Sequence, residues 1–428
     1  MSTSTFIQLQ MKQIKRGRGV VVLRKMKRAL QILPLFPLYI LALLAILVIR
    51  LIQPWLLIRW EVLYSDRIGT FAAYPEMYLC EQDAGINVPQ QSHLDLFYMI
   101  RPICNQQLST MWKRVLHVWP FWILAPIARV NRLIPGGDVH EIGVEHGGAK
   151  DLYNLLDRFP PHLKFTPEED ARGGAGLMLM GIPKNSPFVC LIVRDSAYLD
   201  AHFKNDWNYH NYRDSDIQNY LLAAEELTAR SYFVIRMGAK VHKAMKTTHP
   251  KIIDYATNCM RNDFMDIYLG AKCSFCISTG LGWDEIPEMF RRPIVYTNYV
   301  PPGYFHTFRK EFLNLTKHHI LENEIRELTL SEIFTRGVGF SGYTWDYESK
   351  GIKLIENTPE EIRDIVIEMV ERLNGSWQPH EDDEVLQKRF WKIFLKEAMK
   401  TFNGQPFYGE IRALFGAHFL RNNPEWLK

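Results

Sequence analysis

The chain has few cysteines, and they form no dense pattern. Six cysteines are scattered over 428 residues, and only Cys273 and Cys276 lie close together. Side chains three positions apart on a strand point to opposite faces, so this pair is poorly placed to bind one metal ion. We interpret the cysteines as small buried hydrophobic residues in a reducing compartment.

Acidic residues are missing from the first 28 positions. This basic leader holds Lys12, Lys15, Arg16, Arg18, Arg24, Lys25, Lys27 and Arg28, whereas the remaining 400 residues carry 43 basic and 47 acidic side chains. A slightly acidic body argues against a nucleic-acid partner. The leader itself predicts attraction to anionic membrane lipid.

Charged residues are also missing from Ala29 to Ile49, and apolar character resumes after Arg50 up to Ile58. Twenty-one uncharged, mostly apolar residues are long enough to cross a bilayer, and no small-residue cleavage site of a signal peptide follows them. Residues 29–58 are therefore predicted to be a membrane anchor. Pro34, Pro37 and Pro54 would also let the segment bend back or lie along the membrane.

The stretch 263–302 predicts helix, strand, glycine turn, helix and strand in succession. Asp263 is a possible cap for the first helix, residues 273–278 suit a buried strand, and residues 294–297 form the next strand. A helix that opens after a strand presents free N–H groups, which suit phosphate. We predict a phosphate site at Ser278, Thr279, Gly280 and Gly282, with a merely tight connection as the alternative.

Two further strands are each closed by an arginine. Arg194 follows the apolar run 188–193, Arg236 follows 232–235, and a helical pattern spans 217–229 between them. Ligands of such sheets bind beyond the carboxyl ends of the strands, so we expect both arginines to meet the glycine turn and bind a diphosphate. A structural ion pair at each arginine is the alternative. Asp284 or Glu285 could hold a ribose or sugar hydroxyl.

The first half of the chain repeats this pattern less clearly. Strands are predicted at 60–64 and 93–98, and helices at 72–80 and 105–114. Arg67 and Gly69 follow the first strand and are candidate acceptor-binding residues, although an ordinary turn fits them equally well. The aromatic residues Trp112, Trp119, Phe121 and Trp122 are predicted to be core, with a lipid-facing surface as the alternative.

Two other segments stand out. The loop 209–214 (YHNYRD) is rich in hydrogen-bonding groups, so His210 could contact an acceptor or base, or the loop could be purely structural. Residues 160–185 contain Pro and Gly and predict an interdomain linker.

Several motifs together resemble a poorly characterised family of bacterial glycosyltransferases whose genes are associated with surface-carbohydrate synthesis. The motifs are RIG at 67–69, IVRDSAY at 192–198, YHNYRDS at 209–215, YFVIRMG at 232–238, DIYLGAK at 266–272 and ISTG at 277–280. More distantly, the strand that ends in Arg194 is similar to the donor-site strand of GT-B fucosyltransferases. The histidine that those enzymes carry two residues before the arginine is Ile192 here.

The resemblance implies an α/β, GT-B-like fold of two Rossmann-like domains facing a cleft. The acceptor domain would span residues 59–180, the nucleotide-sugar domain 181–350, and a helical region, 351–428, would complete the fold. The resemblance also implies catalysis without an obligatory metal ion, and no other cofactor is expected. The predicted reaction is sugar transfer to a lipid-linked or other membrane-associated acceptor, and the candidate bases are Asp95, His93, Asp66 and Asp195.

The charge of the N-terminal leader also predicts a cellular location for the protein. The positive-inside rule places residues 1–28 in the cytoplasm, and a nucleotide-sugar donor is available only there, so we expect the catalytic body on the cytoplasmic side of the inner membrane. A nucleotide-sugar epimerase of similar two-domain fold and a non-catalytic scaffold of a polysaccharide assembly complex are the alternatives.

Overall fold

The computed structural model describes residues 36–143, 151–202, 207–401 and 409–428. The chain divides into two compact units. The first comprises residues 1–66, 85–103 and 112–145, and the second comprises 67–84, 104–111 and 146–428. The units are interleaved along the sequence, because two short segments of the first half belong with the second unit.

The first unit contains a small parallel sheet. Strands β1 (Leu57–Leu63) and β2 (His93–Met99) pair in parallel, and single bridges join Trp60 to Glu141 and Phe97 to Val118. Helices α2 (Phe36–Ile52) and α5 (Phe121–Asn131) pack on this sheet, and η2 (Asp138–His140) follows. This is a much smaller sheet than the expected Rossmann-like domain would have.

The second unit is built on a seven-stranded sheet whose paired strands are all parallel, in the order β12-β8-β7-β6-β3-β4-β5. The strands are β3 (Phe188–Ile192), β4 (Phe233–Arg236), β5 (Ile252–Ile253), β6 (Cys276–Ser278), β7 (Ile294–Tyr296), β8 (Phe312–Asn314) and β12 (Leu414–Phe415). All five residues of β3 are buried. An uninterrupted apolar run suits this strand because helices cover both faces of the sheet.

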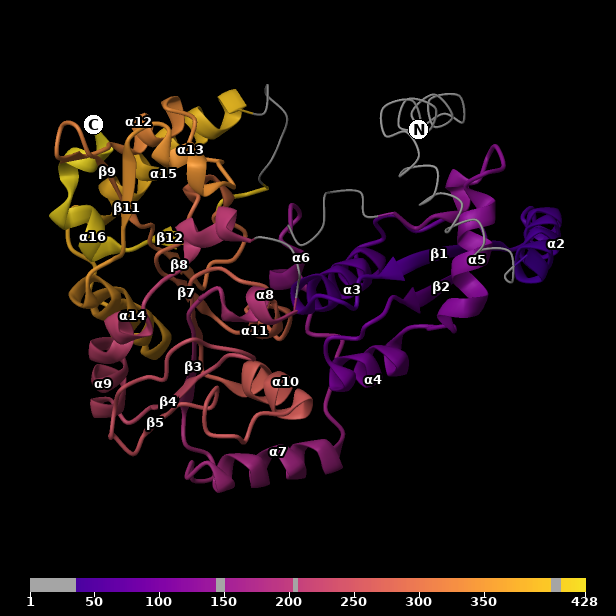
Figure 1. Cartoon of the computed structure of the whole chain (residues 1–428), viewed down its shortest axis with the longest axis horizontal. Helices are drawn as coiled ribbons and strands as arrows, with labels where there is room; N and C mark the ends of the chain where they lie inside the picture. The colour runs from indigo at the N-terminus through magenta and orange to yellow at the C-terminus, as the bar shows by residue number, and fades with distance from the viewer. Residues whose placement is uncertain (1–35, 144–150, 203–206, 402–408) are drawn as a thin grey trace, which may run out of the picture. The chain divides into compact units, whose positions relative to one another are not determined.

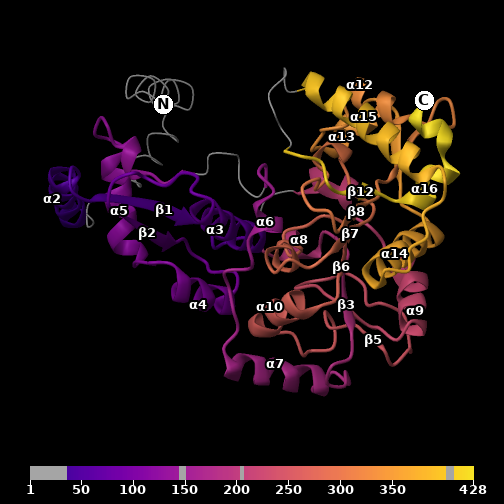
Figure 2. The same ribbon diagram turned by 180° about the vertical axis from the view of Figure 1, so that it is seen from behind.

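Helices lie on both faces of this sheet: α9 (Leu221–Ala229) and α14 (Pro359–Asn374) on one side, and α10 (Asp263–Lys272) and α11 (Glu285–Met289) on the other (Figures 1 and 2). A separate three-stranded antiparallel sheet has the strand order β10 (Arg326–Glu327), β9 (His318–Leu321) and β11 (Ile352–Ile355). The remaining elements are α3 (Ile68–Asp83), α4 (Gln106–Val115), α6 (Leu155–Arg158), α7 (Pro167–Leu179), α8 (Ala197–His202), η3 (Asn208–Arg213), η4 (Ile217–Tyr220), η5 (Pro302–Tyr304), α12 (Leu330–Thr335), α13 (Thr344–Glu348), α15 (Asp383–Thr401), α16 (Ala417–Asn422) and η6 (Pro424–Leu427).

The order of the strands fixes where a ligand site is expected. The chain runs from β3 outward to β4 and β5, then returns to the other side of β3 with β6 and continues outward through β7 and β8. Ligands of doubly wound sheets bind at such a reversal, beyond the carboxyl ends of the two central strands. In this chain those strands are β3 and β6.

The α/β class and the predicted elements of the second half are confirmed, with local corrections. The cap of α10 is Asn262, whose side chain accepts a hydrogen bond from the Met265 N–H, and not Asp263. Much of the predicted linker 160–185 is the helix α7, which a capping box of Thr166 and Glu169 begins. Such a box satisfies two N–H groups that the first turn leaves unpaired.

The aromatic residues of the first half divide between core and surface. Trp112 is buried, but Trp119, Phe121 and Trp122 are exposed, so the prediction of a wholly internal cluster was wrong. Prolines at 120 and 126 frame the exposed group at the start of α5.

The predicted anchor 29–58 contains α2, but residues 1–35 lie outside the described part of the chain. None of the helices within the described ranges combines the length and the apolar character that a bilayer crossing needs.

Candidate functional site

The reversal point of the large sheet brings Arg194 and the glycine turn together. Arg194 lies two residues beyond β3, and Thr279 directly follows β6. The Arg194 backbone N–H donates to Thr279 Oγ1 at 3.0 Å. The structure therefore joins the two features that the sequence placed at one edge of the sheet.

Three basic side chains gather around this point. Arg213, at the end of η3, donates to the carbonyl oxygen of Gly280, and Lys317 Nζ donates to the carbonyl oxygen of Asp214 at 2.5 Å. Arg194 Nε lies 3.3 Å from Asp214 Oδ1. We call Arg194, Arg213, Lys317 and the neighbouring His210 the cation cluster.

Several polar atoms here are buried with unused hydrogen-bonding capacity. Among the described residues, Arg194 Nε and Nη2, His210 Nδ1, Asp214 Oδ1 and Ser215 Oγ have no hydrogen-bond partner. The contact between Arg194 Nε and Asp214 is close enough for an ion pair but poorly aligned for a hydrogen bond. Each unsatisfied buried donor costs about 1–3 kcal/mol, so a ligand that satisfies these atoms would bind favourably.

The electrostatics of the cation cluster also favour an anion. Burial lowers the pKa of Arg194, and the positive charge of Arg213 lowers it further. Burial likewise lowers the pKa of Lys317. Burial, followed by the charges of Arg213, Arg194 and Arg67, lowers the pKa of His210 to about 4. These groups resist carrying charge together, and a bound anion would relieve that repulsion.

Aromatic rings lie beside the cation cluster. The ring of Trp207, the residue before η3, stacks with the ring of His210 on η3 at a centroid distance of 5.9 Å. The ring centroids of Tyr209, also on η3, and Tyr343 are 5.6 Å apart. Tyr343 stacks with Trp345 at 4.5 Å, and both are about half exposed. Because η3 carries Tyr209, His210 and Arg213, one short element connects the charged and aromatic surfaces.

The glycine turn differs from the predicted phosphate cradle. The Gly280 N–H donates to Ser278 Oγ at 3.0 Å, and the Leu281 N–H donates to Asp284 Oδ2 at 2.9 Å. Asp284 is buried, and its carboxylate also accepts from the Ser278 hydroxyl at 2.6 Å. Two N–H groups of this turn are therefore already bound within the chain, and a phosphate site at Ser278, Thr279, Gly280 and Gly282 stays a prediction.

The glycines of this turn have packing roles. A Cβ on Gly69 would lie 2.9 Å from the Gly282 Cα, so both residues permit the start of α3 to approach the turn. Gly280 has a φ of +76°, and a Cβ there would lie 2.3 Å from the Tyr299 ring. A ligand-binding role for Gly69, Gly280 and Gly282 stays a prediction, since packing alone explains their identity.

Arg236 occupies a strand end like that of Arg194 but is already paired. Its Nη1 donates to Asp254 Oδ1 at 3.0 Å, and its Nη2 donates to the Lys243 carbonyl oxygen at 3.1 Å. The side chain is almost fully buried, and only Nε lacks a partner among the described residues. These contacts correspond to the alternative interpretation, a structural ion pair. A donor-binding role for Arg236 has no contact in its favour.

Three of the predicted acid–base residues lie in the first unit. Asp95 forms a buried, two-point ion pair with Arg59, at 2.8 and 2.6 Å. His93 is the first residue of β2, at the amino end of the strand. Ligand sites of parallel sheets lie beyond the opposite ends of the strands, and of the three candidates only Asp66 follows a carboxyl end, that of β1.

Asp195 and Glu285 lie in the second unit. The carboxylate of Asp195 accepts from the Ala197 N–H at 3.1 Å and the His242 N–H at 2.9 Å, which holds the loop after β3. Burial, with the nearby Glu288 and Asp284, raises the pKa of Glu285 well above its ordinary value. Roles for these two residues in catalysis and donor binding stay predictions.

Two carboxylates near the cation cluster have a spacing that can bind a metal ion. The sequence contains one Asp-x-Asp triplet, Asp214-Ser215-Asp216, a pattern that could supply carboxylate ligands to a divalent cation. In the structure both carboxylates face cations, Asp214 with Arg194 and Asp216 with Lys243 at 3.2 Å. Because cations of the protein already lie beside both carboxylates, this arrangement disfavours a metal ion at the triplet.

Elsewhere in the described part of the chain, two groups have the proximity that metal binding requires, namely Glu76 with Cys80 and His162, and the exposed residues 380–382. Arg291 donates to Glu76 at 2.6 Å and to Cys80 at 3.4 Å in the first group, and burial raises the pKa of Cys80 to about 12. A guanidinium ion and a protonated thiol disfavour a metal ion at this position.

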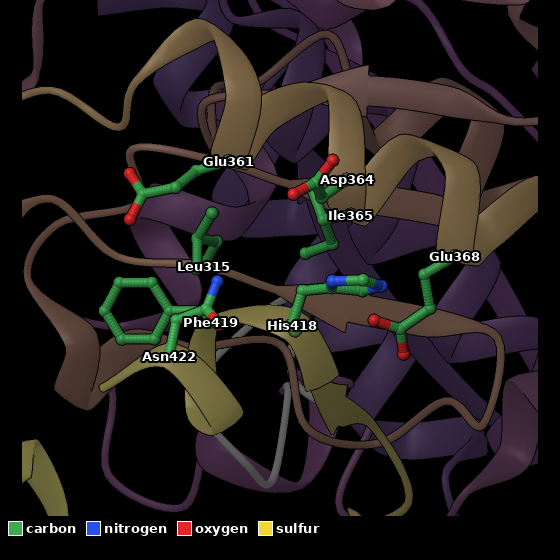
Figure 3. Close-up of a pocket in the computed structure, with 9 residues that line it drawn as sticks. Leu315, Glu361, Asp364, Ile365, Glu368, His418, Phe419 and Asn422 are labelled. Carbon is green, nitrogen blue, oxygen red and sulfur yellow. The ribbon is translucent and has the colours of Figure 1, made fainter. Parts of the chain in front are cut away.

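A separate pocket lies between α14 and α16 (Figure 3). Its carboxylates have partners: Glu361 pairs with His318 at 2.9 Å, Glu368 with Arg372 at 2.8 Å, and Asp364 with Arg363 at 2.7 Å. It shares no lining residue with the cation cluster. With its charges already balanced, this pocket is a weaker candidate site.

The sequence interpretation missed Arg213 and Lys317 as parts of the site. Lys317 follows β8 by three residues, so the rule that singled out Arg194 and Arg236, a basic residue beyond a buried strand, would also have found it. Arg213 lies in the polar loop that the sequence did single out, but its contact with Gly280 joins residues 67 positions apart.

No model of a known protein family and no curated protein matches the chain. Among solved structures, it is similar to a glycosyl transferase of family 9 from Veillonella parvula DSM 2008, with 9% identity and a TM-score of 0.37 over 60% of this chain and 85% of that one. It is also similar to the ADP-heptose lipopolysaccharide heptosyltransferase II of E. coli, with 11% identity and a TM-score of 0.35 over 61% and 90% of the two chains.

A third match is the iron-containing dodecameric glycosyltransferase TibC from enterotoxigenic E. coli H10407, with 10% identity and a TM-score of 0.28 over 59% of this chain and 60% of that one. These TM-scores and identities are low. A function for this chain therefore has to be inferred from its own residues.

Proposed function

We propose that this chain is a glycosyltransferase that binds the diphosphate of a nucleotide-sugar donor at the cation cluster. The observation that carries the proposal is the set of buried, unsatisfied nitrogen atoms of Arg194 and His210 beside Arg213 and Lys317. Phosphate oxygens accept several hydrogen bonds and carry the charge that these groups need. The position at the sheet reversal is where an open α/β sheet binds its ligand.

The chemistry of sugar transfer would use the same groups. When the bond between the anomeric carbon and the diphosphate oxygen breaks, negative charge grows on the departing oxygen. Fixed cations in a buried site stabilise that charge more strongly than water does. Arg194 is the main candidate for this role, and Arg213 and Lys317 would share it.

The aromatic surface supports a ligand that carries rings as well as phosphate. Tyr343 and Trp345 expose part of their faces beside η3. Such faces stack with nucleobases and with the apolar faces of sugars. A nucleotide-sugar combines both kinds of group with a diphosphate, whereas inorganic phosphate would use the cation cluster alone.

The acceptor and the base are assigned from the residues near the ends of the strands. Arg67 and His210 are retained as acceptor-side candidates, and Asp66 is the preferred base because it alone among the first-unit candidates follows the carboxyl end of a strand. We further propose that the acceptor is membrane-associated, that the catalytic body is cytoplasmic and that no metal ion is required.

A binding screen with a following activity assay tests the proposal. Thermal unfolding would be measured with UDP-, GDP-, CMP- and dTDP-sugars and with inorganic pyrophosphate, and at least one nucleotide-sugar should raise the Tm by several degrees. The hit would then be incubated with and without membrane lipid extract. Conversion of the sugar in the absence of any acceptor would indicate an epimerase, and failure of every nucleotide to bind would favour the scaffold.

A further inference from the structure

The first unit exposes a continuous set of apolar side chains along α2. The exposed members are Phe36, Ile40, Leu41, Leu43, Leu44, Leu47, Val48 and Leu51, and Trp55 follows the helix. Only Ala42 and Ile46 of this helix are buried. In both views α2 lies at the outer edge of its unit, beyond α5 (Figures 1 and 2). Water would contact this much apolar surface only at a large free-energy cost, which indicates a partner.

The other face of α2 is fixed to the protein. Ala42 and Ile46 belong to a core that also contains Trp60, Leu96 and Tyr98 from the sheet and Leu124, Ala125, Ala128 and Val130 of α5 and its vicinity. Arg50 donates to Asn131 Oδ1 at 2.9 Å and to the Ile134 carbonyl oxygen at 3.1 Å. Arg129 donates to the Tyr39 hydroxyl at 3.1 Å. The helix is therefore docked along its length.

This docking decides between crossing a membrane and lying on it. A crossing helix places its middle residues at the centre of the bilayer. The middle of α2 instead packs against β1 and β2, the two strands that carry the buried Arg59–Asp95 ion pair. Such a charged pair in the hydrocarbon centre would be costly. One face of α2 can enter lipid while the other stays on the protein only if the helix lies along the interface.

Charge and aromatic residues identify the partner as anionic lipid. Residues 36–58 contain no Asp or Glu, and neither do residues 112–137, which carry Lys113, Arg114, Arg129 and Arg132. The exposed Trp119, Phe121 and Trp122 begin the helix on which α2 packs. Trp side chains favour the membrane–water interface, and basic side chains near it attract anionic headgroups. The eight basic residues at positions 1–28 directly precede this region.

We infer that α2 is an in-plane membrane helix: its exposed face, together with Trp119, Phe121 and Trp122, inserts shallowly into an anionic bilayer, and the chain does not cross the membrane there. This inference is independent of the proposed sugar transfer. Of the alternatives that hydropathy left open for this segment, it selects a helix that lies along the membrane, because the docked face of α2 disfavours a lipid-surrounded span.

The test uses the full-length chain with vesicles of phosphatidylcholine alone or mixed with phosphatidylglycerol. The protein should float with the mixed vesicles, and brominated lipids should quench its tryptophan fluorescence. The variant Leu44→Glu/Leu47→Glu should bind at least about tenfold more weakly, because two charges replace inserted side chains. The matched control is Leu179→Glu/Ile325→Glu, which places charges at two exposed apolar positions of the second unit and should bind like the wild type.

Other outcomes would overturn the inference. Resistance of the native membrane-bound protein to alkaline carbonate extraction would indicate a crossing helix. Equal vesicle binding by Leu44→Glu/Leu47→Glu and wild type would mean that α2 does not insert. A wild-type dimer that this variant dissociates, with no vesicle binding by either, would identify the face as a contact between two copies. Circular dichroism and the Tm establish that each variant is folded.

Discussion

Arg194 lies two residues beyond β3 and Arg236 is the last residue of the neighbouring strand β4, yet their surroundings differ. Arg236 is paired with Asp254 and with the Lys243 carbonyl oxygen, and its neighbourhood is balanced in charge. Arg194 has one imperfectly aligned carboxylate, two unsatisfied nitrogens and further cations beside it. A buried charge with its partners in place holds the fold together, whereas one without them is prepared for a ligand.

The same distinction applies elsewhere in the molecule. Arg59 with Asp95 and His318 with its two glutamates are buried charges with partners, like Arg236. They lie in different units and different sheets, but each joins segments of the chain that are distant in sequence or belong to different elements. The comparison therefore separates residues that should affect stability from those that should affect binding.

The largest effect is expected at Arg236. Replacing it in Arg236→Met leaves Asp254 part-buried without its partner, so the free energy of unfolding should fall by about 3–5 kcal/mol in urea denaturation. The double variant Arg236→Met/Asp254→Leu should recover much of that loss, because neither charge remains. A weaker affinity for nucleotide with unchanged stability would instead place Arg236 at the donor.

Arg194→Ala should show the opposite behaviour. Loss of two charge-assisted hydrogen bonds should weaken binding of pyrophosphate or of the nucleotide-sugar about 100-fold, roughly 3 kcal/mol, and should abolish transfer. The free energy of unfolding should change by less than about 1 kcal/mol, because a repelled and unsatisfied cation is removed. Isothermal titration calorimetry measures the affinity.

The matched control for Arg194 is Arg230→Ala, which removes an exposed arginine that pairs with Glu226 on the same helix. It should leave the affinity unchanged. If Arg194→Ala unfolds the protein but binds ligand normally in its folded fraction, then Arg194 belongs with Arg236 and the comparison fails.

The variant Asp95→Asn tests whether Asp95, a candidate catalytic base, instead serves to stabilise the fold. An amide retains an acceptor but loses the charge that Arg59 needs, so we expect the protein to lose about 2 kcal/mol of stability. Turnover by the folded variant, measured well below its Tm, should stay within a few-fold of the wild type. A drop of 100-fold or more at unchanged stability would restore Asp95 as a base.

His318 should produce the smallest effect, visible only in the pH dependence of stability. Burial opposes its positive charge, but hydrogen bonds from the ring to Glu327 and Glu361 outweigh burial and raise its pKa to about 10. Its stabilisation is therefore complete below the unfolded pKa of about 6.5 and is lost as pH rises through about 10.

The corresponding measurement is urea denaturation between pH 6 and pH 10. The wild type should lose stability on the order of 1–2 kcal/mol more than His318→Gln does across that range, and nucleotide binding should be equal in the two proteins at neutral pH. Parallel pH profiles would show that the imidazole is not held as a cation.

Much of the second half was predictable because its signals are local. Buried strands such as 188–193 are continuous apolar runs, and helices such as 217–229 repeat apolar residues at the helical period. Arg194 was found for the same reason, since it directly follows such a run. At the glycine turn the Leu281 N–H is bound by Asp284, a near neighbour in sequence to which the sequence interpretation assigned another role.

Other features depended on contacts between distant residues. The partner of Arg236 lies 18 positions away, the lysine of the cation cluster reaches a carbonyl group 103 positions away, and α2 packs on residues from two strands and another helix. No local pattern encodes these neighbours. The amino-acid sequence thus determined the elements and the positions of the basic residues at their ends, because hydrogen-bonded periodicity is local. Only the tertiary structure decided which buried charges have partners and which face of α2 is covered, because burial and charge compensation are set by residues that folding brings together.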